Sequence, residues 1–250
     1  INIKPMSFSF FFKKKKQNLF HNMVDFHNHI LPGIDDGSKS IAQSLKMLDI
    51  YQDLGVEAVI ASPHIYKDLY PNTPESISKS FETLSPKAIQ KNVEMKGYAA
   101  EYLVDEFFLE HLKNNTPLLC CFDRHVLIEI PFIGRLKILE EALFAMQNAG
   151  YTAILAHPER YAAIHKTTDL ENLKIRGAKM QLNALSLKGY YGPEARKKAS
   201  EWLVKDQYEF VGTDAHNEQQ LLKLKSLQLN KKQRAAWRKV CERQAEQVNA

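Results

Sequence analysis

Two histidines and two aspartates lie close together near the start of the chain. They belong to the stretch VDFHNHILPGIDDGSKS at 24–40, which contains His27, His29, Asp35 and Asp36. Imidazole nitrogens and carboxylate oxygens are donors with which proteins bind zinc, iron and manganese. A His-x-His pair by itself is common, and a lone histidine at a strand end is more often a hydrogen-bonded core residue. The stretch therefore indicates a metal site only if other donors join it.

Further histidine and acidic residues follow other short apolar runs in the same way. They occur in the motifs ASPHIY (His64), YAAEY (Glu101), LIEIP (Glu129), LAHPERY (His157) and GTDAH (Asp214 and His216). Glu129 is the hardest to explain as a structural residue, because an unpaired carboxylate in an apolar segment is costly and needs a cation or another partner.

The apolar runs are predicted strands that alternate with predicted helices. We expect strands at 23–26, 58–61, 93–99, 126–128, 152–155, 179–182 and 209–211. Helical patterns cover 41–54, 105–114, 136–148, 169–176, 193–204 and 231–247. This alternation favours parallel strands joined by crossover helices. Since functional residues of parallel α/β barrels gather at the carboxyl ends of the strands, the donors should converge on one face.

The converging set is too large for one metal ion. It contains the imidazoles of His27, His29, His64, His157 and His216, and the carboxylates of Asp36, Glu101, Glu129 and Asp214. These nitrogen and oxygen donors suit two or three ions that share bridging carboxylates. Metal clusters of this kind commonly activate water for in-line attack on phosphorus. The motifs therefore favour a metal-dependent hydrolase of phosphate esters.

Composition indicates one globular domain of 250 residues, of which 44% are hydrophobic, so a sizeable core can form. The net charge of +5 falls to +1 without the four lysines at 13–16, which leaves no basic face for a nucleic acid. The cysteines Cys120, Cys121 and Cys241 form no CxxC pair and are odd in number, which favours a reducing compartment. No apolar run approaches the roughly 20 residues that span a bilayer.

The first 22 residues form a basic and aromatic segment. FSFFF precedes KKKK, the reverse of the order in a secretory signal, and no small-residue cleavage site follows. We predict a flexible segment at 1–22 and one catalytic domain at 23–250. The alternative is that this segment binds weakly to a membrane surface or to a partner.

With these residues placed, the chain resembles the polymerase and histidinol phosphatase (PHP) superfamily. Within it, the chain is most similar to the metal-dependent bacterial protein-tyrosine phosphatases of capsular and exopolysaccharide biosynthesis loci. The resemblance runs from about 24 to 217 and rests on DFHNHILPGIDDGSKS, ASPHIY, AAEYLVD, LIEIP, LAHPERY and GTDAHN, in family order. It implies a single α/β domain with a distorted (β/α)7 TIM-like barrel. It also implies a trinuclear site that commonly uses manganese, with iron, zinc and magnesium as alternatives.

The resemblance also implies how the donors divide among the metals. The first metal would take His27, His29, Glu101 and Asp214; the second would share Glu101 and add Glu129 and His157; the third would take Asp36, His64 and His216. Asp35 would support a ligand or the local structure.

Arg160 in HPERY matches the phosphate-binding arginine of the family, and a guanidinium fork fits a phosphoryl group. A surface ion pair with Glu159 is the alternative. Arg160, Glu101, His157 and Asp214 are the expected catalytic residues.

The implied reaction is hydrolysis of phosphotyrosine on the C-terminal tail of a membrane tyrosine kinase that controls polysaccharide assembly. The enzyme would then work in the cytoplasm near the inner face of the membrane. Whether it forms a homo-oligomer is not decided by the sequence. No covalent cysteine intermediate is expected, because neither CCFDR nor CER has the loop with which cysteine phosphatases wrap phosphate. Alternatives are a PHP phosphatase for a small metabolite such as histidinol phosphate, and a non-catalytic PHP module.

One departure from the family concerns an arginine that often follows the last motif. The segment HNEQQLLKLKS has none, so Lys223 or Lys225 would substitute, or this phosphate contact is absent. The connection at 64–93, which starts with a Pro-rich loop, is the expected specificity element.

Overall fold

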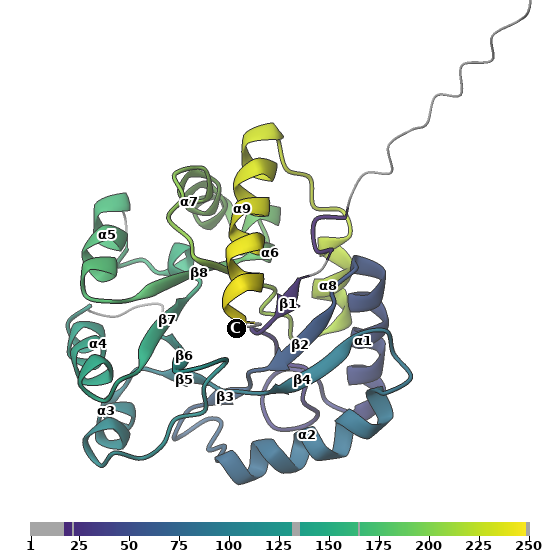
Figure 1. The fold of residues 1–250 in the computed structure, drawn as a ribbon, viewed down its shortest axis with the longest axis horizontal. Helices are drawn as coiled ribbons and strands as arrows, with labels where there is room; N and C mark the ends of the chain where they lie inside the picture. Colours follow the sequence, from purple (N-terminus) through teal and green to yellow (C-terminus); the bar gives the residue numbers. More distant parts are fainter. Residues whose placement is uncertain (1–17, 22, 132–135, 165, 249–250) are drawn as a thin grey trace, which may run out of the picture.

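In the computed structural model, parallel strands lie in the middle of the molecule and helices surround them (Figure 1). The structure describes residues 18–21, 23–131, 136–164 and 166–248. The strands are β1 (Val24–Asp25), β2 (Ala58–Ala61), β3 (His64–Ile65), β4 (Glu94–Tyr98), β5 (Glu101–Leu103), β6 (His125–Glu129), β7 (Thr152–Ala156), β8 (Lys179–Asn183) and β9 (Phe210–Gly212). The helices are α1 (Ile41–Leu54), α2 (Pro74–Ala88), α3 (Glu106–Lys113), α4 (Lys137–Asn148), α5 (Thr167–Ile175), α6 (Ala184–Lys188), α7 (Pro193–Val204), α8 (Glu218–Leu224) and α9 (Lys231–Val248), with a 3-10 turn, η1 (Pro158–Arg160).

The strands pair in two parallel sheets, in the orders β1-β2-β4 and β3-β5-β6-β7-β8-β9. The β2–β4 pairing runs on toward the β3–β5 pairing, since Ala99 N donates to Ala61 O at 2.7 Å and Glu101 N donates to Pro63 O at 3.0 Å. A parallel bridge between Asn28 and Ala215 joins the segments that follow β1 and β9. The chain is thus a single α/β domain with parallel sheets, as the alternating pattern predicted.

Successive strand residues point to opposite sides of the sheets and build two separate apolar clusters. In β7, Ile154 and Ala156 belong to the inner cluster, whereas Ala153 and Leu155 belong to the outer cluster, which the helices cover. The same alternation in β6 puts Glu129 on the inner side with Leu127. The candidate donors, some within strands and others just past them, therefore continue this column of inward-facing residues.

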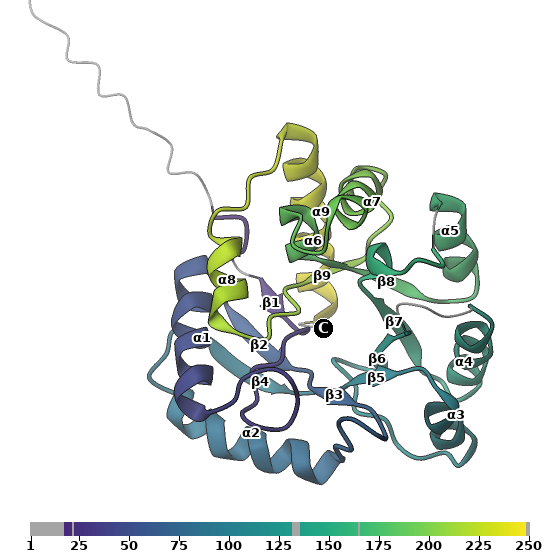
Figure 2. The same cartoon turned by 180° about the vertical axis from the view of Figure 1, so that it is seen from behind.

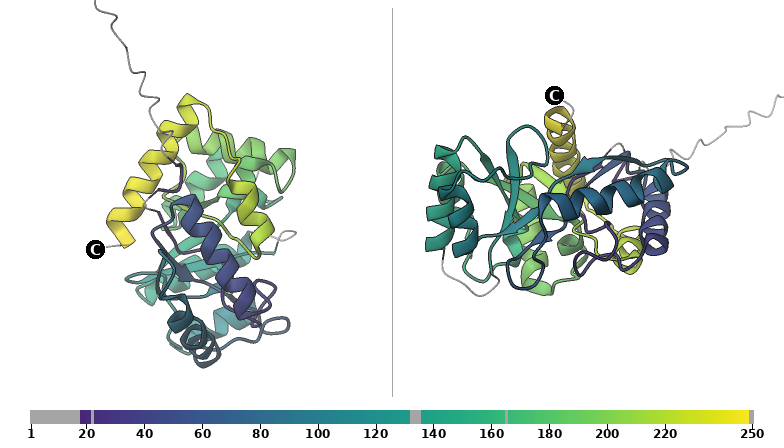
Figure 3. Two further views of the ribbon diagram at one scale, coloured as in Figure 1. Left: turned by 90° about the vertical axis from the view of Figure 1, so that its right-hand side faces the viewer. Right: turned by 90° about the horizontal axis from the view of Figure 1, so that it is seen from below.

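The last helix, α9, covers the opposite end of this column. Its Gln244 accepts a hydrogen bond from Val211 N at 2.7 Å and donates one to Val24 O at 2.8 Å, and Val248 packs on the inner cluster. Figure 3 shows α9 along one side of the molecule, and the reverse view in Figure 2 shows α8 beside α1. Gln43 of α1 donates to Glu218 of α8 at 2.8 Å.

The predicted helices at 41–54 and 193–204 coincide with α1 and α7, but α2, α6 and α8 were not predicted. The largest omission is α2, in the connection at 64–93. Its start is set locally, because the Thr73 side chain accepts from Ser76 N and Pro74 occupies the first turn. Among the described residues, no helix is both long and apolar enough to cross a membrane.

The predicted N-terminal segment at 1–22 falls mostly outside the described residues. Its described part, 18–21, packs on α9: the rings of Phe20 and Trp237 lie 5.3 Å apart, and Trp237 Nε1 donates to Leu19 O at 2.7 Å. Phe20 is buried. The packed structure thus begins before the predicted boundary at residue 23, because Phe20 fills a site on α9 that the sequence pattern does not reveal.

Candidate metal centre

The structure brings all nine predicted donors together in one cluster. His64 begins β3, Glu101 begins β5 and Glu129 ends β6. The segments that follow β1, β7 and β9 carry His27, His29, His157, Asp214 and His216, and Asp36 lies in the loop before α1. These donors come from sequence positions far apart, so their meeting is a property of the fold.

Glu101 is the centre of the cluster. Its Oε1 lies 3.2 Å from His27 Nε2 and 3.3 Å from His157 Nε2. Its Oε2 lies 3.2 Å from His64 Nδ1 and 3.4 Å from His29 Nε2. The carboxylate is fully buried, so four imidazoles face one desolvated charge.

In the part of the chain that the structure describes, donor atoms that lie within 4.8 Å of one another form three groups that could hold a metal ion. These are His27, His29, Glu101 and Asp214; His64, Glu101 and Glu129; and His29, Asp36, His64 and His216. The first has the composition expected for the first metal, and the third contains all the residues expected for the third metal. The second holds His64 where His157 was expected, although His157 Nε2 lies 3.9 Å from Glu129 Oε2.

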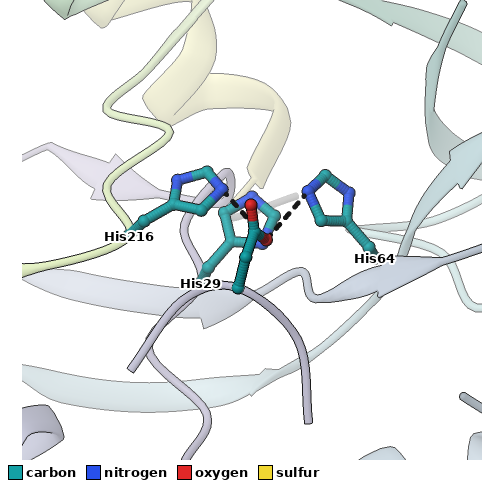
Figure 4. Close-up of side chains that lie close together, drawn as sticks. His29, His64 and His216 are labelled. Carbon is teal, nitrogen blue, oxygen red and sulfur yellow. Dashed lines mark ion pairs between the residues drawn. The ribbon is translucent and has the colours of Figure 1, made fainter. Parts of the chain in front are cut away.

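The third group is the most open. Asp36 Oδ1 lies 3.5 Å from His64 Nε2 and 3.4 Å from His216 Nε2. Figure 4 shows the rings of His29, His64 and His216 gathered around one carboxyl group. The Asp36 side chain is about half exposed, whereas the other carboxylates of the cluster are buried. A substrate can therefore approach from the Asp36 side.

The hydrogen-bonding state of the cluster fits a cation site. Buried atoms without a hydrogen-bond partner include His27 Nε2, His29 Nε2, His64 Nδ1, both carboxylate oxygens of Glu101 and Glu129 Oε1. Leaving one such group unsatisfied costs about 1–3 kcal/mol, and native proteins contain few of them. Because these atoms face one another, divalent ions among them would satisfy the whole set.

The charges of the cluster depend on one another. Burial by itself would lower the pKa of His27, but the carboxylates of Glu101 and Asp214 raise it well above its ordinary value. Burial would raise the pKa of Glu101, but His27 and the neighbouring imidazoles hold it well below its ordinary value. Each of these two buried groups therefore favours the charged form of the other.

Two residues outside the donor set orient its imidazoles. Gln181 Oε1 lies 2.9 Å from His27 Nδ1, and Asp35 Oδ2 lies 2.8 Å from His29 Nδ1. Each contact occupies Nδ1 and leaves Nε2 directed at the cluster, the usual arrangement behind metal-binding histidines. Asp35 also accepts from Gly37 N at 2.9 Å, and a Cβ on Gly37 would lie 2.2 Å from His29 O, so only glycine fits there. The sequence suggested a supporting role for Asp35 but missed Gln181.

A buried network below the donors ties β1 to β9. Asp25 Oδ1 accepts from Thr213 N at 3.1 Å, and Asp25 Oδ2 accepts from Tyr51 Oη at 2.8 Å. Burial raises the pKa of Asp25 despite these hydrogen bonds. The network fixes the two segments that carry His27 and Asp214.

The backbone is unusual at two candidate donors. His157 has φ 35° and Asp214 has φ 50°, both in the left-handed region. Such conformations cost energy for residues other than glycine and gather at functional sites. His157 directly follows β7 and Asp214 lies just after β9, so these turns aim the two side chains into the cluster.

Arg160 lies next to the cluster. Its Nη1 donates to Asp214 Oδ2 at 2.7 Å, and its guanidinium lies 3.9 Å from the centre of the Tyr191 ring. An exposed ion pair with Glu159 does not describe the structure, because the Glu159 residue is 1% exposed and the Arg160 side chain 17%. Glu159 instead accepts from Tyr208 Oη at 3.0 Å.

Two residues outside the predicted site also contact Asp214. Asn183 Nδ2 donates to Asp214 Oδ2 at 2.8 Å, and Tyr191 Oη donates to the same oxygen at 3.4 Å. Asn183 ends β8, so its position at a strand end was the signal available. The sequence holds no comparable signal for Tyr191.

The structure separates the two lysines considered as replacements for the absent arginine. Lys225 Nζ lies 2.7 Å from Asp53 Oδ2, at the end of α1. Lys223 Nζ lies 5.8 Å from the centre of the Tyr190 ring, whose neighbour Tyr191 stacks on Arg160. Lys223 is therefore the better placed of the two.

Known proteins are similar to this chain in sequence. The family described as capsular polysaccharide synthesis, CpsB/CapC, matches residues 23–249. The chain is 29% identical over 197 residues to the tyrosine-protein phosphatase YwqE of Bacillus subtilis, which covers 78% of each chain. It is 31% identical over 197 residues to the putative tyrosine-protein phosphatase CapC of Staphylococcus aureus, which covers 78% of this chain and 77% of that one.

A solved structure is also similar. It comes from work on YwqE of Bacillus subtilis and CpsB of Streptococcus pneumoniae, described as unique metal-dependent tyrosine phosphatases. The TM-score is 0.73 at 26% identity, and the match covers 90% of this chain and 95% of that chain.

Proposed function

Because the chain belongs to the capsular polysaccharide synthesis family CpsB/CapC, we propose that it is a metal-dependent phosphatase that hydrolyses phosphotyrosine in proteins. The observation that carries the proposal is the buried Glu101 carboxylate, surrounded by four imidazoles at 3.2 to 3.4 Å. A purely structural core has no need for so many mutually dependent charges. The names of the relatives YwqE and CapC support the choice of phosphotyrosine.

We propose that two or three divalent ions, manganese in the first place, occupy the cluster. The donors His27, His29, Glu101, Asp214, Glu129, His157, Asp36, His64 and His216 would hold them, with Glu101 shared. Bound divalent ions would supply positive charge to the phosphoryl oxygens and make a water more acidic.

The residues of the chain then position the ester. Arg160 is the only described arginine with a hydrogen bond to a candidate donor, and its fork can take two phosphoryl oxygens. Asp214 holds that guanidinium at the edge of the cluster. In the reaction a water oxygen bonds to phosphorus and gives up a proton, while the bond from phosphorus to the tyrosine oxygen breaks and the released phenolate takes up a proton from solvent. Since the phenol has a pKa of about 10, its oxygen leaves with little assistance.

Replacing Arg160 by alanine should mainly raise the Michaelis constant. The change removes a charged donor to the phosphoryl group, worth about 1.5–3 kcal/mol, which corresponds to roughly ten- to a hundredfold in kcat/KM. Steady-state kinetics with a phosphotyrosine peptide measures the effect. Arg124→Ala is a suitable control, because Arg124 binds Gly150 O and Ala149 O at the other end of β7. A lower kcat with an unchanged Michaelis constant would contradict phosphate binding by Arg160.

The substrate assignment is tested with metal-loaded protein and three substrates in parallel: a phosphotyrosine peptide, the same peptide with phosphoserine, and histidinol phosphate. We expect the highest kcat/KM for the phosphotyrosine peptide. Activity on histidinol phosphate alone would instead identify a phosphatase of small metabolites. No activity on any of them, with metal bound, would favour a non-catalytic module.

We further propose that the natural substrate is the C-terminal tail of a membrane tyrosine kinase, so that the enzyme acts in the cytoplasm near the membrane. The description of the family as capsular polysaccharide synthesis supports a partner in that process. The three free cysteines are compatible with a reducing compartment.

We also interpret the two sheets as one distorted (β/α)7 barrel. Two residues separate β2 from β3, and two separate β4 from β5, so each pair can be counted as one interrupted strand. The bridge between Asn28 and Ala215 supports closure between the first and last strands. On this interpretation the cluster lies at the carboxyl end of the barrel, as is usual for catalytic sites in such folds.

A further inference from the structure

Two tyrosines beside the cluster have no part in the function described so far. Tyr66 follows β3, and since strand residues alternate, it lies on the same side as His64, while Ile65 between them packs in the outer cluster. Tyr70 returns to Tyr66 through a small antiparallel bridge, with hydrogen bonds of 2.9 and 3.0 Å between their backbones.

The rings of both tyrosines contact His64. The Tyr66 ring lies 4.4 Å from the His64 ring, and the Tyr70 ring lies 5.5 Å from it in a stacked orientation with an angle of 15°. The two tyrosine rings are 5.6 Å apart. Both tyrosines are only partly buried.

The loop is anchored next to the cluster. Asn72 Nδ2 donates to His64 O at 2.9 Å and to Ile34 O at 2.8 Å, which joins the loop to the segment that carries Asp36. The tip of the loop faces solvent, where Leu69 is 72% exposed. The two rings therefore border the open, Asp36 side of the cluster from a fixed position.

We propose that Tyr66 and Tyr70 form the binding surface for the aromatic ring of the substrate and thereby select aryl over alkyl phosphates. The proposal rests on the phosphatase function above. In an aryl phosphate a single oxygen joins the ring to phosphorus, so when phosphorus is at the cluster, the ring must lie directly beside it. Aromatic pairs prefer offset or edge-to-face contacts, which two rings at different tilts can provide. Phosphoserine has no ring to place there.

The test compares phosphotyrosine and phosphoserine forms of one peptide in the variants Tyr66→Leu and Tyr70→Leu. Loss of either ring should lower kcat/KM for the phosphotyrosine peptide by roughly three- to tenfold and leave the phosphoserine peptide nearly unchanged. Tyr66→Phe and Tyr70→Phe keep the ring and should retain the preference. Phe144→Leu, which removes an exposed ring from α4, is the matched control.

A binding measurement separates this role from a structural one. The affinity for a non-hydrolysable phosphonate analogue of phosphotyrosine should fall in the leucine variants, while the affinity for inorganic phosphate and the metal content stay constant. If the rings only held His64 in place, the leucine variants would lose kcat/KM for both peptides and would also lose metal. The proposal would then be wrong. An unchanged preference in all variants would also overturn it. Failure of the proposed function is distinct, because the unmodified enzyme would then hydrolyse no phosphotyrosine peptide.

Discussion

Glu101→Gln is expected to lower kcat/KM for phosphotyrosine hydrolysis by more than about a hundredfold. Mutation of residues that merely support metal ligands already lowers metal affinity or activity by about ten- to a hundredfold. Glutamine has nearly the same shape, so the packing around position 101 is retained while the negative charge is lost. Glu101 faces His27, His29, His64 and His157 at once. Its neutralisation therefore weakens every part of the cluster that depends on this carboxylate.

The measurement combines kcat/KM with the metal content of the purified protein. Glu94→Gln provides the matched control, because Glu94 is an exposed residue of β4 and the same chemical change there should have no effect. Circular dichroism checks that the fold is retained. Activity within tenfold of the original, with a full complement of metal, would show that Glu101 does not bridge the ions.

Removal of the metals is expected to abolish the activity and to destabilise the fold. The donors bind a cation only in the folded state, because they come from segments between residues 27 and 216. A ligand of the folded state at about a thousand times its Kd adds about 4 kcal/mol to the free energy of unfolding. We therefore expect EDTA to lower the melting temperature, and manganese to restore both activity and stability. EDTA already saturated with manganese is the control, and it should lower neither the activity nor the melting temperature.

Metal binding should also release protons. Although burial alone would lower the pKa of His27 and His29, their carboxylate neighbours raise it, so these imidazoles hold protons more tightly than usual when no metal is bound. A metal needs the unprotonated nitrogens, so its apparent affinity should fall as the pH is lowered. Titration calorimetry in two buffers with different ionisation enthalpies measures the released protons.

Full activity in excess EDTA would refute the metal mechanism as a whole.

The donor residues could be found from the sequence because each has a local signature. Strands end where an apolar run ends, and the His, Asp or Glu that follows is visible in motifs such as LAHPERY and GTDAH. Parallel strands bring these ends to one face, so convergence follows once the alternation of strands and helices is recognised. Fold class and candidate donor set were therefore within reach of the sequence.

The surroundings of the donors were decided by the tertiary structure. Gln181 and His27 are 154 residues apart, and only the closeness of β8 to the segment after β1 brings them together. Asn183 and Tyr191 reach Asp214 in the same way. Similarly, the sequence predicts a flexible segment that includes Phe20, because its partner Trp237 lies in a helix at the other end of the chain.

The sequence by itself thus determined which side chains are candidate metal ligands and that they gather near strand ends, because a strand end is a local property of the chain. The tertiary structure decided which nitrogen of each imidazole faces the centre, how Arg160 is held by Asp214, and which rings border His64. Those features depend on contacts between distant segments, and such contacts exist only after the strands have been placed side by side and the helices packed around them.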